Sequence, residues 1–121
     1  MVTVRYIVTD VDKAVAFYTG HLGFTTQQQF GPNMAILKLG DLTLWLAGPN
    51  ASASRPMPDG RKPEPGGWNR FVIEVADLAA MVAKLKGAGA RFRNDIVSGP
   101  GGQQILLEDP FGNVVELFQP A

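Results

Sequence analysis

Few side chains of this 121-residue chain can take part in chemistry, and most of these are carboxylates and guanidinium groups. The chain contains no cysteine, which excludes disulfides, thiol nucleophiles and thiolate-bound metals. Its one histidine, His21, falls in the last turn of a predicted helix, where it would complement the helix C-terminus. A role for His21 as a metal ligand or general base is the alternative. The charged residues of the strand-like segments are therefore the main candidates for a functional site.

These charged residues lie on faces of predicted strands, because successive side chains of a strand point to opposite sides. We expect three faces to point away from the helices: Thr3, Arg5 and Ile7; Arg70, Val72 and Glu74; and Val114, Glu116 and Phe118. The residues that alternate with them, such as Tyr6 and Leu117, are apolar and are expected to pack on the helices. The face of each sheet that points away from the helices would therefore carry both charged and apolar side chains.

The elements that position these faces occur twice along the chain. Asp10 and Asp77 each follow a strand-like run, and each can cap a helix because a carboxylate accepts hydrogen bonds from free helix amides. Hairpin-like segments then surround Gly40-Asp41 in the first copy and Gly112-Asn113 in the second. A repeat of this length predicts two copies of one supersecondary unit, neither able to bury its hydrophobic face alone.

Apolar periodicity and turn residues define the elements of both copies. The first copy is predicted to form strands at 2–8, 24–30, 34–39 and 42–47 and a helix at 11–22. The second is predicted to form strands at 70–75, 92–97, 103–108 and 114–118, a helix from Asp77 through Leu85, and a glycine-rich turn at 98–102. The predicted fold class is α+β, with two β-α-β-β-β modules in pseudo-two-fold symmetry, each curved mixed sheet partly enclosing a cavity.

This organisation predicts a single domain, 1–121, with module one at 1–47 and module two at 68–121. Residues 48–67 between the modules contain five prolines and show no apolar periodicity. They form either a solvated linker or a flap over a binding site, because long loops in compact domains often act as lids.

The composition disfavours two classes of partner. Eleven basic residues balance eleven acidic ones, so the charge of the chain favours neither nucleic acid nor a membrane surface. No apolar run approaches the ~20 residues of a membrane span. No basic leader followed by an apolar run precedes the first strand pattern, and we therefore expect a cytoplasmic protein.

Several segments resemble the vicinal oxygen chelate superfamily, which includes glyoxalase I, bleomycin-resistance proteins and extradiol dioxygenases. The resemblance rests on Val8-Thr9-Asp10, Ala16-Phe17-Tyr18, His21-Leu22-Gly23-Phe24 and Leu107-Glu108-Asp109-Pro110-Phe111-Gly112-Asn113-Val114-Val115-Glu116-Leu117. It implies two modules that curl around a cavity, usually in a dimer. For the enzymes of the superfamily it also implies a divalent metal, held by His, Glu or Gln at symmetric strand positions and acting as a Lewis acid.

The metal-ligand positions implied by this resemblance fall on Thr3, Arg70, Glu116 and Leu44, or on Trp45 instead of Leu44 after a one-residue shift. Only Glu116 has a side chain that can bind a metal, whereas catalytic sites use about three protein ligands. We therefore predict no metal and no cofactor. We predict instead that Arg70 forms an ion pair with Glu116, with Arg5 and Glu74 as further members of the charged group.

Three functions are compatible with these residues. The first is a metal-independent small-molecule-binding protein that resembles the bleomycin-resistance branch and sequesters a drug or metabolite in a homodimer cavity. The second is a glyoxalase-like lyase or isomerase with an atypical or absent metal site, in which Glu116 or Glu74 acts as acid or base. The third is a structural or regulatory domain with a vestigial cavity. The residues predicted to line the cavity are Thr3, Arg5, Leu44, Arg70, Glu74, Glu116 and Phe118.

Overall fold

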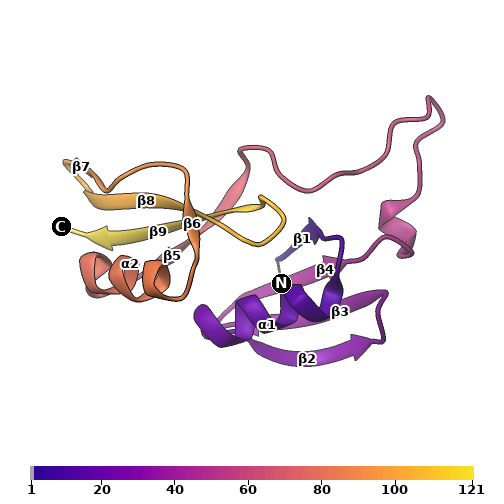
Figure 1. The fold of residues 1–121 in the computed structure, drawn as a ribbon, viewed down its shortest axis with the longest axis horizontal. Helices are drawn as coiled ribbons and strands as arrows, with labels where there is room; N and C mark the ends of the chain where they lie inside the picture. Colours follow the sequence, from indigo (N-terminus) through magenta and orange to yellow (C-terminus); the bar gives the residue numbers. More distant parts are fainter. Residues whose placement is uncertain (1) are drawn as a thin grey trace. The chain divides into compact units, whose positions relative to one another are not determined.

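The computed structural model describes residues 2–121, and the chain divides into two compact units, Met1–Pro65 and Gly66–Ala121. Each unit contains one mixed β-sheet and one α-helix that packs on it (Figure 1). The predicted α+β class with two β-α-β-β-β modules is confirmed. The prediction that 1–121 forms one domain stays a prediction. No helix within residues 2–121 has the length and apolar character needed to cross a membrane.

Unit one follows the predicted order of elements. Its elements are β1 (Thr3–Ile7), α1 (Val11–His21), β2 (Thr25–Phe30), β3 (Met34–Leu39) and β4 (Leu42–Ala47), followed by a 3-10 turn, η1 (Ser52–Ser54). The strands form a four-stranded sheet in the order β1-β4-β3-β2. β1 runs parallel to β4, and the other neighbours are antiparallel.

Unit two repeats this arrangement with one extra strand. Its elements are β5 (Arg70–Glu74), α2 (Leu78–Gly87), β6 (Arg91–Phe92), β7 (Val97–Gly99), β8 (Gly102–Glu108) and β9 (Val114–Pro120). The sheet order is β5-β9-β8-β6, with β7 also paired to β8, and β5 is parallel to β9. The strand order of unit one is thus reproduced, which confirms the predicted internal repeat.

The predicted strand at 92–97 is wrong, because two short strands take its place. β6 ends at Phe92 and β7 begins at Val97. Between them, the Oδ1 atom of Asn94 accepts a hydrogen bond from the amide of Leu106 at 2.9 Å, so a side chain replaces the backbone partner and interrupts the ladder. The predicted turn at 98–102 is shorter than expected, because Gly99 pairs with Gly102.

Both helices begin in the same way and cover one side of their own sheet. The Oδ1 atom of Asp10 accepts from the amide of Lys13 at 3.0 Å, and that of Asp77 accepts from the amide of Ala80 at 3.0 Å. These bonds satisfy amides that the first helical turn leaves without partners. The buried helix residues are Val11, Ala14 and Tyr18 in α1 and Leu78, Val82 and Leu85 in α2. Among residues 2–121, no α-helix of the same unit covers the opposite face of either sheet.

Candidate functional site

An ion pair between Arg70 and Glu116 lies on the helix-free face of unit two. Arg70 is opposite Val114 and Glu116 is opposite Val72, so the two charged side chains are diagonal neighbours on adjacent strands. The Nε and Nη2 atoms of Arg70 both donate to Oε1 of Glu116, at 3.0 and 2.8 Å. Glu116 is only 8% exposed, so loss of Arg70 would leave its carboxylate largely removed from water and without an ion-pair partner. The predicted ion pair is confirmed.

Glu74, which we predicted to join this ion pair, does not do so. Glu74 lies on the same face as Arg70, opposite Phe118, but its residue is exposed and none of the ion pairs among residues 2–121 includes it. Arg5 belongs to unit one, where its guanidinium lies 4.9 Å from the centre of the Trp45 ring. Strand alternation predicted the faces of Arg5 and Glu74 correctly, but a shared face does not determine which charged groups meet.

A second ion pair, which the sequence analysis missed, lies beside the first. The Nε atom of Arg93 donates to Oε2 of Glu108 at 2.8 Å. Glu108 is opposite Val114 on the neighbouring strand, so it lies on the face of Arg70 and Glu116. The period-two pattern of β8 could have revealed Glu108. Arg93 could not be found in this way, because it lies at the point where the predicted strand is interrupted.

The two arginines hold the chain that leads into β5. Arg93 donates through Nη1 to the carbonyl of Gly67 at 2.7 Å and through Nη2 to that of Gly112 at 3.0 Å. Arg70 donates through Nη1 to the carbonyl of Trp68 at 3.3 Å. The guanidinium of Arg93 also lies 4.5 Å from the Trp68 ring centre, within cation–π range. Residues 67 and 68 are thereby fixed against the open face of the sheet.

The turn between β8 and β9 is hydrogen-bonded to the same region. The buried carboxylate of Asp109 accepts from the amides of Phe111 and Asn113, both at 2.9 Å, and from Nδ2 of Asn113 at 3.0 Å. The Oδ1 atom of Asn113 in turn accepts from the amide of Gly66 at 2.8 Å. The turn thus connects the end of β8 to the start of the segment that carries Trp68.

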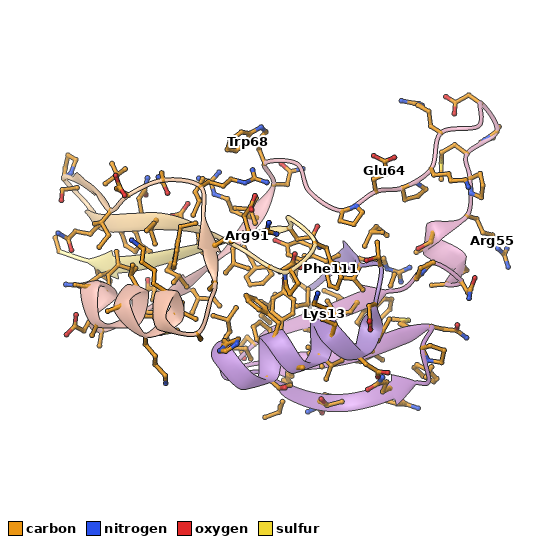
Figure 2. All side chains as sticks on the ribbon, in the orientation of Figure 1. Lys13, Arg55, Glu64, Trp68, Arg91 and Phe111 are labelled. Atoms are coloured by element: carbon orange, nitrogen blue, oxygen red, sulfur yellow. The ribbon has the colours of Figure 1, made fainter. Side chains whose placement is uncertain are left out.

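The open face of unit two also presents apolar side chains to solvent. Val72 is 51% exposed and Trp68 is 69% exposed, while Leu106 and Phe118 are half-buried. Figure 2 shows the Trp68 ring at the outer edge of this unit. Leu106 is opposite Glu116, and Phe118 is opposite Glu74, so both belong to this face. This face therefore combines an apolar surface with two ion pairs, in each of which the opposite charges compensate one another.

In unit one the predicted position of Leu44 is wrong. Leu44 is opposite Val4 and Leu37, is fully buried, and therefore lies on the helix-covered face. Trp45, opposite Arg5, lies on the open face with Thr3 and is the true counterpart of Glu116. The count from the turn glycine fails because Leu42 adds one residue before Thr43, the partner of Thr3. The alternative with a one-residue shift is the correct one.

The family model of the Glyoxalase/Bleomycin resistance protein/Dioxygenase superfamily matches residues 1–117, and the chain therefore belongs to this superfamily. A member of the same superfamily from Sphaerobacter thermophilus DSM 20745 is 27% identical, with a TM-score of 0.76 over 97% of this chain and 94% of that one. TnmS3, an antibiotic binding protein from Streptomyces sp. CB03234, is 26% identical, with a TM-score of 0.72 over 98% and 93%. A search of curated proteins gives no match.

A lactoylglutathione lyase from Agrobacterium tumefaciens shares the fold at 22% identity, with a TM-score of 0.74 over 98% of this chain and 92% of that one. The resemblance described above implies a divalent metal in such enzymes, and the residues here can be compared with that requirement. At the four equivalent positions stand Thr3, Trp45, Arg70 and Glu116.

These four residues do not fit a divalent metal. The only carboxylate among them accepts two hydrogen bonds from a guanidinium, and a metal cation in that place would face the positive charge of Arg70. No group of three or more His, Cys, Asp or Glu within residues 2–121 is arranged to hold a metal ion. His21 lies in the last turn of α1 with its ring 5.5 Å from that of Phe17, in an edge-to-face contact. The position of His21 in the last helical turn is as predicted.

Proposed function

We propose that the protein binds a small organic molecule without a divalent metal and sequesters it, as the bleomycin-resistance branch of the superfamily does. The observation that carries this proposal is the Arg70–Glu116 ion pair. In this pair, the guanidinium binds the carboxylate that a metal ion would need as a ligand. Metal-assisted lyase or isomerase chemistry has less support, because it would require this pair to separate and leave a mostly buried Glu116 charge uncompensated.

The ligand that this face suits best is partly apolar. Val72, Leu106, Phe118 and Trp68 offer apolar contact, and the charged groups between them already satisfy one another. We propose that Arg70, Glu74, Glu116 and Phe118 contribute from unit two. Thr3 and Arg5 would contribute from unit one, together with Trp45 in the place predicted for Leu44. The 26% identity to an antibiotic binding protein supports a drug or metabolite as the ligand class.

We further propose that the protein forms a homodimer in the cytoplasm. Large apolar groups exposed on the sheets, such as Val72 and Phe30, would be protected from water in a dimer. Size-exclusion chromatography with light scattering tests the dimer, because a monomeric mass across the working concentration range would contradict it. Cell fractionation tests the location.

The experiment that tests the binding function is a thermal-shift screen of aromatic antibiotics and small carboxylates, performed in EDTA. A ligand that binds only the folded state raises stability by about 2.7 kcal/mol at 100 times its Kd, which raises the Tm measurably. A hit that retains its affinity in EDTA supports the proposal. A ligand that binds only after a divalent metal is added would contradict it.

A matched pair of variants locates the site for any hit. Val72→Asp places a charge on the open face of unit two, where Val72 is 51% exposed, and should reduce affinity at least tenfold. Ala83→Asp adds the same charge to an exposed position of α2, on the other side of the sheet, and should leave affinity unchanged. Equal effects of both variants would contradict binding at the open face.

A further inference from the structure

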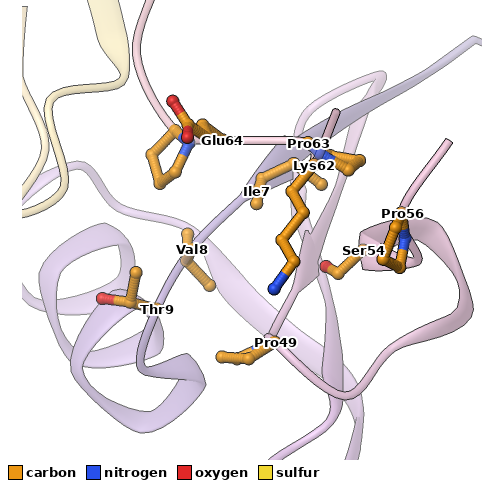
Figure 3. Close-up of a pocket in the computed structure, with 10 residues that line it drawn as sticks. Ile7, Val8, Thr9, Pro49, Ser54, Pro56, Lys62, Pro63 and Glu64 are labelled. Carbon is orange, nitrogen blue, oxygen red and sulfur yellow. The ribbon is translucent and has the colours of Figure 1, made fainter. Parts of the chain in front are cut away.

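The proline-rich segment after β4 forms a cavity of its own with the end of β1. Its volume is about 340 Å³, within the range of ~300–1,000 Å³ typical of small-molecule sites. One wall comes from Ile7, the last residue of β1, and from Val8 and Thr9, which follow it, and the other comes from residues 49–65 (Figure 3). All of the lining residues belong to unit one, and none belongs to the sheet face of unit two discussed above.

The wall made by this segment is held in place by short-range contacts. The Oγ atom of Ser54 donates to the carbonyl of Gly48 at 2.7 Å, and the amide of Ala51 donates to the same carbonyl at 3.1 Å. Further along, the amide of Met57 donates to the carbonyl of Arg61 at 2.7 Å. The lining prolines, Pro49, Pro56, Pro63 and Pro65, have fixed φ angles. The wall is thus organised before a ligand arrives, which lowers the entropic cost of binding.

The cavity contains one cationic group that faces inward. Figure 3 shows the amine of Lys62 directed into the cavity toward Ser54, whereas the carboxylate of Glu64 points away from that amine. The ion pair that the segment makes within residues 2–121 joins Arg61 to Asp59, at 2.8 Å, and does not involve Lys62. Lys62 is an exposed residue, and the other lining of the cavity includes apolar groups from Ile7, Val8 and the prolines. The arrangement is complementary to a small anion with a hydrocarbon body.

We propose that this cavity is a second binding site, which takes a small organic carboxylate. Lys62 Nζ donates a charge-assisted hydrogen bond to the carboxylate, and the organic body packs on Pro49, Ile7 and the neighbouring prolines. Residues 49–65 thereby have a role as part of a site, beyond those of a linker or a flap. The site is independent of the binding function proposed for the sheet face.

The test is a titration of the full-length protein with benzoate, followed by amide chemical shifts in ¹H–¹⁵N spectra. Prolines give no amide signal, so Thr9, Ser54, Lys62 and Glu64 report on the cavity. We expect saturable shifts at these residues, and at least tenfold weaker binding of benzamide, which has the same shape without the charge. Benzamide that binds as tightly as benzoate would overturn the proposal.

Two variants make the test specific to the cavity. Lys62→Gln should weaken benzoate binding about tenfold, as expected for the loss of one charge-assisted hydrogen bond. Arg55→Gln removes the same charge from the same segment, but Arg55 points away from the chain into solvent (Figure 2) and should leave the affinity unchanged. Equal losses in both variants would show a general charge effect and overturn the site. Shifts confined to β5, β8 and β9 would also overturn it, and would assign benzoate to the sheet face instead.

Discussion

The two units have the same architecture but different residues at their equivalent open-face positions. Unit one has Thr3 and Trp45 where unit two has Arg70 and Glu116. On the helix-covered faces the units agree, because Leu44 and Leu46 in one and Val115 and Leu117 in the other are all fully buried. The helix-covered faces of the two sheets are thus alike, apolar and buried, whereas the open faces differ in their chemistry. Unit two carries the charged pair, and unit one carries an aromatic ring and a hydroxyl.

Removal of Arg70 should have the largest effect on this comparison. In Arg70→Ala, the carboxylate of Glu116 loses its ion-pair partner while only 11% of its side chain is exposed to water. We expect a loss of about 2–3 kcal/mol in the free energy of unfolding, less than for a fully buried pair because Arg70 itself is 31% exposed. Urea denaturation measures the loss.

The double variant Arg70→Ala with Glu116→Gln is the control for that experiment. It removes the uncompensated charge and should recover part of the stability lost in Arg70→Ala. If Arg70→Ala unfolds at the same urea concentration as the wild type, the ion pair does not stabilise unit two. The different open-face residues of the two units would then not differ in their contribution to stability.

Arg93→Ala should have the next largest effect, also in unit two. It removes the ion pair with Glu108, two hydrogen bonds to carbonyls and the contact with Trp68. We expect a loss of about 1.5–2 kcal/mol in the free energy of unfolding. Faster hydrogen exchange at residues 66–68 should accompany it. Arg91→Ala, at an exposed position of β6, is the matched control and should change neither quantity.

The helix caps should give equal effects in the two units, because their geometry is the same. Asp10→Ala and Asp77→Ala each remove a side-chain hydrogen bond of 3.0 Å to a helix amide. Each should cost about 1 kcal/mol. Thermal unfolding of both variants checks this, and a twofold difference between their losses would show that the repeat is not energetically symmetric.

Arg5→Gln should have the smallest effect and concerns unit one. Arg5 is exposed, and its guanidinium lies 4.9 Å from the centre of the Trp45 ring. Loss of this contact should cost about 0.5 kcal/mol. The variant Arg5→Lys keeps a cation and should lose less. A loss as large as that of Arg70→Ala would remove the distinction between the two units.

Alternation and capping were sufficient to predict much of this molecule from sequence. Asp10 and Asp77 mark the helix starts, and the period of two along the strands separates the face of Arg70 and Glu116 from that of Leu117. Both patterns depend only on neighbouring residues in the sequence, so they can be recognised without knowing which strands pair. The Arg70–Glu116 pair was predicted from the metal-ligand positions that the resemblance implies, and alternation placed both residues on one face. The structure adds that they are diagonal neighbours on adjacent parallel strands.

Features that depend on register or on loops could not be predicted. The position of Leu44 changed face because a shift of one residue exchanges the two sides of a strand. Arg93 was missed because Asn94 interrupts the strand there through a side-chain hydrogen bond. The cavity around Lys62 arises where 49–65 meets the end of β1, a contact between distant segments that no local pattern indicates.

The proposal that the open face does not bind a divalent metal is tested most directly by a calorimetric titration of EDTA-treated protein with Zn²⁺, Ni²⁺ and Mn²⁺. Because the carboxylate of Glu116 is paired with Arg70, we predict no stoichiometric binding of any of these ions to the wild type. Binding of one equivalent per chain, abolished in Glu116→Gln, would contradict it, since it would show that the open face is a metal site after all.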